Sequence, residues 1–320
     1  MKVSYKEFLL FVKHNILELM PDHSNYEVRI EKMTRENNLE LYGVAVKAPG
    51  DVTAPILNLD NYFREYIKGE SISEVLKQIA ADYMSAEKQT EKLEHLFNFE
   101  WEHVKDLIGF QLMNQKLNKM MLSNSVYTPV VDLAKVYQII IPFDEQCLGS
   151  TPVTKEIMAS WNISMEELEH KANENMMKRF PAKLVNMRER ILENMIGIPT
   201  RNLLAEGMTK ISGDVYVLTN QDGPQGASAM LYPGTLEQIR NMLGNDFYIV
   251  PDSTEEVIVI PKKRNVNAVD LQSILKGTNS FVPEIEFLSD RVYEYNDNTK
   301  TIGIANDGLC ATRKASDRAR

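Results

Sequence analysis

The segment from residue 215 to 260 constrains the fold more than any other part of this chain, because strand signals lie on both sides of a helix signal. The predicted elements are two strands at 214–219 and 227–232, a helix at 235–243, and two further strands at 247–250 and 257–260. Turn-forming residues separate the strands of each pair, and Gly244 ends the helix. The segment therefore predicts a β-hairpin, a helix and a second β-hairpin in close succession.

The predicted helix at 235–243 places Leu236, Ile239 and Leu243 on one face. An apolar face on a short helix has to be buried against a neighbouring layer. We therefore expect these three side chains to pack across antiparallel strands.

The composition is that of a folded chain, and its charge disfavours polyanionic partners. Of the 320 residues, 43% are hydrophobic and 25% are charged, and the formal net charge is −9. An acidic body repels nucleic acid unless a local basic patch exists. The two cysteines, Cys147 and Cys310, are too few for a disulfide framework and suit a reducing compartment.

Membrane insertion is not expected from this sequence. No apolar run approaches the roughly 20 residues that a spanning helix needs. Charged residues interrupt the apolar N-terminus, and no small-residue cleavage site follows it. We expect a cytoplasmic protein.

Helix and strand signals alternate along the rest of the chain. Capping boxes formed by Ser4 with Glu7 and by Ser71 with Glu74 each predict the start of a helix. Further strands are predicted at 26–33, 39–46, 55–59, 104–113, 130–141, 291–295 and 301–305, and further helices at 60–66, 154–190 (in several pieces) and 268–275.

These elements indicate an α+β fold in which antiparallel β-hairpins are interleaved with helices, in two modules. The N-terminal α+β module covers residues 1–200 and includes a helical segment at 154–195. The C-terminal module covers residues 210–306 in a ββαββ-type order, and a polar tail at 307–320 is expected to be disordered. The junction is placed near 195–213, where the apolar periodicity is weakest.

Several short stretches together carry a family resemblance. They are residues 57–62, Tyr66, Trp161, 166–168, 217–220, 226–228, 231–234, 251–256 and 288–293. On these residues the chain resembles a bacterial family of uncharacterised proteins, a domain of unknown function from anaerobic gut Firmicutes. Relatives often have Pro-Ser-Ser-x-His-Glu where this chain has Pro-Asp-Ser-Thr-Glu-Glu, so it keeps Ser253 and Glu256 but lacks the histidine. The resemblance implies a fold and no established activity.

The turn at 251–256 is the first candidate site. It brings Asp252, Ser253 and Glu256 to the end of two apolar strands, a usual place for binding groups. These side chains suit a cation or a polar ligand, and clustered carboxylates are expected to raise at least one pKa. The alternative is a structural turn, because Pro, Asp, Ser and Thr make local backbone hydrogen bonds.

A second candidate is a ligand pocket formed by Asn58, Asp60, Tyr62 and Tyr66. Aromatic side chains beside a carboxylate and an amide suit a small polar ligand. At helical spacing, the aromatic side chains equally suit a hydrophobic core.

Two other motifs do not have the residue spacing that a catalytic or metal site requires. Ser228 follows Gly-Ala but lacks the second glycine of a nucleophile elbow. His95 and His103 match no zinc-binding pattern. The sequence therefore predicts no metal and no cofactor.

Residues 154–173 have the outline of a helix-turn-helix, and basic residues are frequent at 171–190. The turn that would approach DNA phosphates carries Glu166, Glu167 and Glu169, and acids there suit the N-terminus of a helix instead. Association with nucleic acid through 171–190 therefore ranks third, with weak and salt-sensitive binding expected.

The leading hypothesis is a non-enzymatic cytoplasmic binding or regulatory protein, whose partner is a protein or a small molecule. The second hypothesis is a hydrolase-like enzyme that uses the acidic and hydroxyl residues near 251–256.

Overall fold

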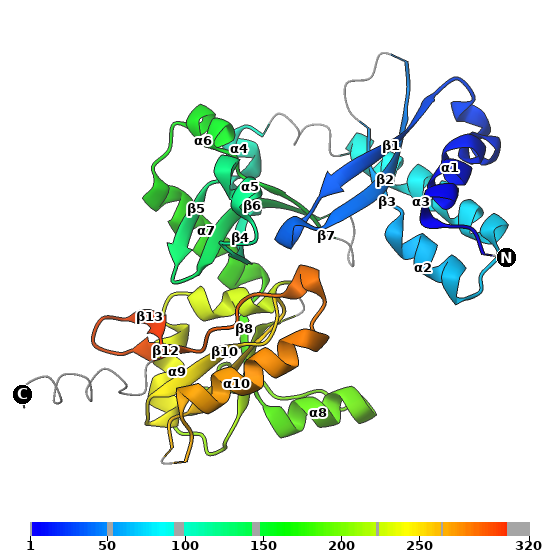
Figure 1. The fold of residues 1–320 in the computed structure, drawn as a ribbon. Coiled ribbons are helices and arrows are strands. Elements are labelled where there is room, and N and C mark those ends of the chain that lie inside the picture. Colours follow the sequence, from blue (N-terminus) through cyan, green and yellow to red (C-terminus); the bar gives the residue numbers. More distant parts are fainter. Residues whose placement is uncertain are drawn as a thin grey trace, which may run out of the picture. The chain divides into compact units, whose positions relative to one another are not determined.

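The computed structural model divides the chain into two compact units, each of which is built around antiparallel sheets (Figure 1). The structure describes residues 2–49, 54–92, 99–142, 148–221, 224–263 and 265–305. Unit 1 spans Met1–His103 and unit 2 spans Val104–Arg320. Helices alternate with the strands in both units, so the predicted α+β fold class is confirmed.

Unit 1 is a three-stranded sheet with helices packed against it. Its elements are α1 (Tyr5–Asn15), η1 (Ile16–Leu19), η2 (Pro21–His23), β1 (Glu27–Thr34), η3 (Glu36–Asn38), β2 (Glu40–Lys47), β3 (Leu57–Asn58), α2 (Asp60–Lys68), α3 (Ile72–Lys92) and α4 (Trp101–Val104), which reaches the boundary. β2 pairs with β1 on one edge and with β3 on the other. The predicted capping box opens α1, because Ser4 and Glu7 each accept the other's backbone N–H.

The core of unit 1 lies between this sheet and helices α1 and α3. Phe8 of α1, Ile79 and Tyr83 of α3, and Val44 of β2 are fully buried there. The Tyr83 hydroxyl accepts the Val46 N–H at 2.8 Å and donates to the Val46 carbonyl at 2.9 Å. These two bonds satisfy a buried polar group and fix α3 to β2.

The first half of unit 2 is a four-stranded sheet with β6 at its centre. Its elements are η5 (Lys105–Leu107), β4 (Ile108–Asn114), α5 (Lys119–Asn124), β5 (Tyr127–Val130), β6 (Leu133–Pro142), β7 (Leu148–Pro152), α6 (Lys155–Trp161) and α7 (Met165–Arg179). β6 pairs with β4, β5 and β7. α7 packs on β4 and buries Leu168, Ala172 and Met176, so its apolar stripe faces this sheet.

The second half of unit 2 is a six-stranded sheet in the order β13-β12-β10-β11-β9-β8. Its elements are β8 (Ala182–Asn186), α8 (Met187–Ile196), β9 (Tyr216–Asn220), η6 (Gly226–Leu231), α9 (Thr235–Leu243), β10 (Phe247–Pro251), β11 (Val257–Pro261), α10 (Ala268–Thr278), η7 (Asn279–Phe281), η8 (Glu284–Glu286), β12 (Tyr293–Asn296) and β13 (Thr301–Ile304). Each neighbouring pair is antiparallel. The edge strand β8 is covered by the loop at 202–203, because Leu203 donates to the Leu184 carbonyl at 2.9 Å.

The 3₁₀ helix η6 lies between the two sheets of unit 2. It contacts β4 of the four-stranded sheet and β8, β9 and β11 of the six-stranded sheet. Ala227, Ser228 and Ala229 are fully buried, and the Ala227 N–H donates to the Thr254 carbonyl at 3.1 Å. Side chains this small let the backbone of η6 approach both sheets closely.

The helix at 235–243 and the second hairpin confirm the sequence prediction. Leu236, Ile239 and Leu243 of α9 expose 8% or less of their surface. β10 and β11 form the predicted antiparallel hairpin around 251–256, and β12 and β13 form the predicted terminal hairpin. The expected disordered tail at 307–320, both cysteines and His95 lie outside the described residues.

The predicted return strand at 227–232 is wrong, because this segment forms η6. β9 already pairs with β8 on one edge and with β11 on the other, so no edge is free for a third neighbour. The helical segment predicted at 154–195 also contains a strand, β8. β8 and β9 lie on the two sides of the expected junction near 195–213 and belong to one sheet. The boundary between the two compact units instead falls between residues 103 and 104.

Substitution of Gly226 by alanine is expected to destabilise unit 2. A Cβ atom at Gly226 would overlap the Thr219 hydroxyl and the Glu255 carbonyl oxygen. Overpacking at such a site costs about 1–3 kcal/mol. Urea unfolding of Gly226→Ala should show this loss of unfolding free energy.

Gly277→Ala is the matched control, because Gly277 lies in α10 and a Cβ there meets no atom within 4 Å. Alanine in a helix interior is favoured over glycine by about 1 kcal/mol. The control should therefore be neutral or stabilising. Equal effects of the two substitutions would contradict the packing of η6 described above.

Candidate functional site

Only two of the four predicted ligand residues of unit 1 line a common pocket. Asn58 and Tyr62 line a pocket of about 700 Å³ whose wall also includes Glu65, Glu70 and Glu74. The Tyr62 hydroxyl donates to Asp82 at 2.6 Å. The pocket therefore holds only half of the predicted set.

Asp60 and Tyr66 connect α2 to the N-terminal segment instead of lining that pocket. The Asp60 carboxylate accepts the Tyr5 hydroxyl, and the Tyr66 hydroxyl accepts the Val3 N–H at 2.8 Å. The Tyr66 ring stacks on Phe8, with ring centroids 6.1 Å apart. These contacts are those of a core, which was the alternative for the aromatic residues of this set.

The turn at 251–256 is held by hydrogen bonds of its own. The buried Ser253 hydroxyl accepts the Glu255 N–H at 3.1 Å, and the Ser253 N–H donates to the Glu256 carbonyl at 3.2 Å. Thr219 donates to the Glu255 carbonyl at 2.8 Å, which fixes the turn on β9. The Ser253 side chain therefore serves the turn itself.

The carboxylates of this turn have raised pKa values. Burial raises the pKa of Asp252, and it raises the pKa of Glu256 against the opposing influence of Arg190, 3.6 Å away. Asp252 adds a smaller repulsive contribution at Glu256. The expected raised pKa is thus present, although desolvation outweighs repulsion as its cause.

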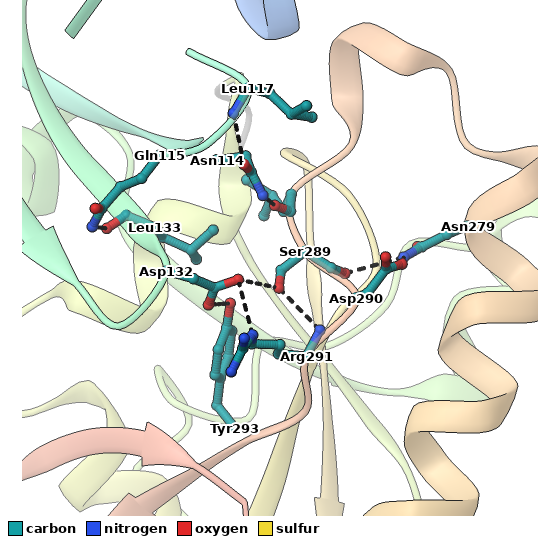
Figure 2. Close-up of polar contacts among 11 residues, drawn as sticks. Asn114, Gln115, Leu117, Asp132, Leu133, Asn279, Ser289, Asp290, Arg291 and Tyr293 are labelled. Atoms are coloured by element: carbon teal, nitrogen blue, oxygen red, sulfur yellow. Dashed lines mark hydrogen bonds and ion pairs between the residues drawn. The ribbon is translucent and has the colours of Figure 1, made fainter. Parts of the chain in front are cut away.

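A third group of polar residues lies where the four-stranded sheet of unit 2 meets the segment before β12 (Figure 2). Asp132, in the turn between β5 and β6, accepts the Ser289 hydroxyl at 2.7 Å through one carboxylate oxygen. Its other oxygen accepts the Tyr293 hydroxyl, also at 2.7 Å. We call Asp132, Ser289 and Tyr293 the clasp, because they join the two sheets of unit 2.

Both hydroxyl groups of the clasp belong to buried residues. Tyr293 is fully buried and Ser289 is 1% exposed. Burial raises the pKa of the Tyr293 phenol, and the Asp132 carboxylate raises it further, so this phenol stays protonated and donates. Asn114 adds a second link at the same place, since its side-chain amide donates to the Leu288 carbonyl at 2.7 Å.

The turn that carries Asp132 has a strained backbone. Val131 has a φ of 59°, in the left-handed region that a β-branched residue rarely adopts. Such strain persists only where surrounding contacts hold the backbone, and it is concentrated at functional sites. The hydrogen bonds of Asp132 are among the contacts that hold this turn, together with the bond from the Gln115 N–H to the Asp132 carbonyl at 3.1 Å.

A pocket of about 950 Å³ opens beside the clasp, and we call it the clasp pocket. Its polar lining includes Asn114, Gln115, Lys116, Lys119, Ser123, Asp132, Lys155, Asp290 and Arg291, and its apolar lining Leu117, Leu122, Tyr127, Val131 and Phe287. All of these residues belong to unit 2. The volume is in the range of about 300–1,000 Å³ that small-molecule sites occupy.

The carboxylates of the clasp pocket have hydrogen-bond or ion-pair partners, whereas its lysines have no carboxylate partner among the described residues. Asp132 accepts the two clasp hydroxyls and lies 3.8 Å from the Arg291 guanidinium, and Asp290 accepts the Asn279 amide at 2.8 Å. Lys155 donates to the Ser123 carbonyl at 2.6 Å. Among the described residues, Lys116, Lys119 and Lys155 form no ion pair with a carboxylate. The pocket therefore presents positive charge beside an apolar wall.

Sequence reasoning missed the clasp pocket. Its lining comes from three distant segments, at 114–132, at Lys155 and at 287–291. One signal was present, because residues 288–293 were among those that carried the family resemblance. That stretch contains Ser289, Arg291 and Tyr293.

The described residues hold no group of three or more His, Cys, Asp or Glu side chains placed to bind a metal ion. Within that same part, no helix combines the length and the hydropathy that a membrane crossing requires.

The fold and the clasp pocket define an α+β protein with a ligand-sized cavity. Residues 5–297 match a family described as a family of unknown function (DUF5688), and the chain belongs to that family. No curated protein and no solved structure matches the chain.

Removal of the Asp132 carboxylate is expected to destabilise unit 2 more than removal of its partner hydroxyl. Asp132→Ala leaves two buried donors without an acceptor, at about 1–3 kcal/mol each, whereas Tyr293→Phe removes a donor together with its bond, at about 1 kcal/mol. Urea unfolding of both variants measures the difference. A smaller loss in Asp132→Ala than in Tyr293→Phe would show that the clasp does not hold the sheets together.

Asp252→Asn is expected to raise the melting temperature at pH 7. Folding raises the pKa of Asp252, so the ionised carboxylate destabilises the fold above the folded pKa. That penalty disappears as the pH falls to the unfolded value of about 4. In thermal melts, the gain from the substitution should therefore shrink once the pH falls through the folded pKa, and it should be nearly lost at about pH 4.

Asp214→Asn is the control, because folding lowers the pKa of Asp214 instead of raising it. A hydrogen bond from Lys263 lowers the pKa of Asp214, so its ionised form contributes stability above the unfolded pKa. This variant should not gain stability at pH 7. A rise in melting temperature in both variants would mean that net charge, and not burial of Asp252, is responsible.

Proposed function

We propose that this protein is a non-enzymatic binding protein that holds a small amphipathic anion in the clasp pocket. The observation that carries the proposal is one pocket of about 950 Å³ in which lysines that have no carboxylate partner among the described residues lie beside an apolar wall. A ligand with an aromatic or aliphatic body and one anionic group matches both surfaces. The size favours a small molecule over a protein segment.

The clasp pocket has more cations than carboxylates in its lining, although the chain as a whole is acidic. The lining contains the four cations Lys116, Lys119, Lys155 and Arg291 and the two carboxylates Asp132 and Asp290. The chain as a whole has a net charge of −9. A local positive region on an acidic protein attracts anions specifically to that region.

The clasp supports binding because it holds the pocket wall in place before a ligand arrives. Asp132 is fixed by two hydrogen bonds to buried residues, and the strained turn at Val131 is held with it. A wall that is already ordered loses little conformational entropy on binding. The carboxylate of Asp132 therefore has a positioning role in this proposal.

The hydrolase-like alternative at 251–256 has one observation in its favour, which is the raised pKa of Asp252 and Glu256. Raised pKa values of carboxylates occur at catalytic sites and at buried structural sites alike. Ser253, however, is 8% exposed and its hydroxyl is bonded within the turn. We therefore rank catalysis at this turn below binding at the clasp pocket.

Association with nucleic acid through 171–190 ranks last. Lys171 pairs with Asp106 at 2.8 Å, and Lys183 and Arg190 both lie beside Glu193. Arg179 is partly buried and donates to the Ile140 carbonyl at 3.3 Å. Cations that are already paired contribute less to phosphate binding.

We place this binding role in the cytoplasm of a bacterium. The two cysteines and the acidic composition support a reducing, aqueous compartment. The bacterial setting rests on the resemblance described for the sequence.

The proposal is tested with phenyl phosphate as the probe, measured by isothermal titration calorimetry on the full chain. Inorganic phosphate and phenol are the matched probes, since each carries only one half of the proposed ligand chemistry. Phenyl phosphate should bind more tightly than either. Added salt should weaken its binding, because part of the attraction is electrostatic.

The decisive variant is Lys116→Glu/Lys119→Glu, which should weaken the binding of phenyl phosphate at least about tenfold, or 1.4 kcal/mol. Lys210→Glu/Lys276→Glu carries the same change of net charge on exposed residues outside the pocket. This control should bind like the wild type. Absence of binding at about 10 mM phenyl phosphate, or equal weakening in both variants, would refute the proposal.

A further inference from the structure

Helix α8 belongs to unit 2 and is labelled in Figure 1. Polar side chains attach it to the rest of the unit. Arg190 donates to Glu193 at 2.8 Å and lies 3.6 Å from Glu256 in the turn after β10. Glu193 also accepts the hydroxyl of Thr200 at 3.0 Å and its N–H at 3.2 Å. The hydrogen bond from Arg190 is the main reason that the pKa of Glu193 is lowered to about 2.

Both ends of α8 are well formed, so its outward face has a fixed arrangement. The Asn186 side chain accepts the Arg188 N–H at 2.9 Å at the start of the helix. Gly197, with a φ of 70°, ends the helix and donates to the Glu193 carbonyl at 2.8 Å. Glycine adopts this left-handed conformation without strain, as is common at helix ends.

The outward face of α8 is apolar. The exposed fractions are 50% for Ile191, 51% for Leu192, 73% for Met195, 60% for Ile196 and 61% for Ile198, just beyond the helix. Residues four apart lie on the same side of a helix, so Ile191 with Met195 and Leu192 with Ile196 form one stripe. A helix on a protein surface ordinarily turns its apolar stripe inward, and α8 does the opposite.

We infer that α8 is the interface of a symmetric homodimer, in which the apolar stripes of two copies pack antiparallel. Exposed side chains of this size offer roughly 100 Å² each, so two stripes would bury about 1,000 Å² in total, the lower limit for a specific interface. A two-fold interface requires a patch that is complementary to itself. An all-apolar stripe meets that requirement without opposed like charges.

The antiparallel arrangement fixes which residues meet. With the two-fold axis at the middle of the stripe, Leu192 of one copy lies against Met195 of the other, and Ile191 against Ile196. The exposed Arg188 then approaches the C-terminal end of the opposite helix. A cation is favoured at that end by the helix dipole.

The test is sedimentation velocity of the full chain over a range of micromolar concentrations. The wild type should form a dimer, and Leu192→Lys and Met195→Glu should each be monomeric, because each places two charges in an apolar contact. An equimolar mixture of the two variants should dimerise again. In the mixed pair, the new lysine and the new glutamate meet once, and the original Leu192 and Met195 meet once.

Ile274→Lys is the matched control, because Ile274 on α10 is 62% exposed and lies outside the stripe. It should remain dimeric, and circular dichroism should show the same fold in all variants. A monomeric wild type at every concentration overturns the inference, as does a dimer that persists in both stripe variants. Failure of the mixture to dimerise also overturns it. So does a monomer that binds phosphatidylglycerol vesicles through this face.

Discussion

The packing of η6 between the two sheets of unit 2 is the contact on which the candidate site depends. η6 touches β4 on one side and β8, β9 and β11 on the other, so it fixes the distance and orientation of the sheets. Its Ala and Ser side chains are fully buried, and Gly226 leaves no room for a Cβ atom against β9. Because the sheets are fixed in this way, the segment before β12 lies beside the turn between β5 and β6. The clasp can form only in that arrangement.

The clasp then converts this arrangement into a defined pocket wall. One carboxylate, Asp132, satisfies two buried hydroxyl groups and holds a turn whose Val131 is strained. Its negative charge is thereby committed to the fold, and Lys116, Lys119 and Lys155 line the same pocket. In the same unit, α8 contacts its neighbours through polar side chains and exposes its apolar side chains. Polar groups therefore hold unit 2 together at two places where an apolar core would be the usual means.

Features set by local interactions could be predicted from the sequence. The capping box of Ser4 and Glu7, the buried face of α9 and the hairpins β10–β11 and β12–β13 involve residues close together in the chain. The strand β8 was missed because the residues on both sides of it have helical or weak patterns. The apolar residues of α8 face outward, which the sequence pattern alone does not show. The return strand at 227–232 was predicted wrongly because an alternation of small residues does not show whether a strand edge is free to accept them.

The sequence by itself determined the α+β class, most element positions and the family, because caps, turns and periodicity act over a few residues. It also supplied the residues at 288–293 without revealing their role. Only the tertiary structure decided that Asp132 and Tyr293, 161 positions apart, meet in one hydrogen bond. The tertiary structure also bonded Asp60 and Tyr66 to the N-terminal segment, while Asn58 and Tyr62 line a pocket. Contacts of this kind depend on how the sheets and helices of a unit pack together. Packing involves residues from the whole unit, so no short stretch of sequence predicts these contacts.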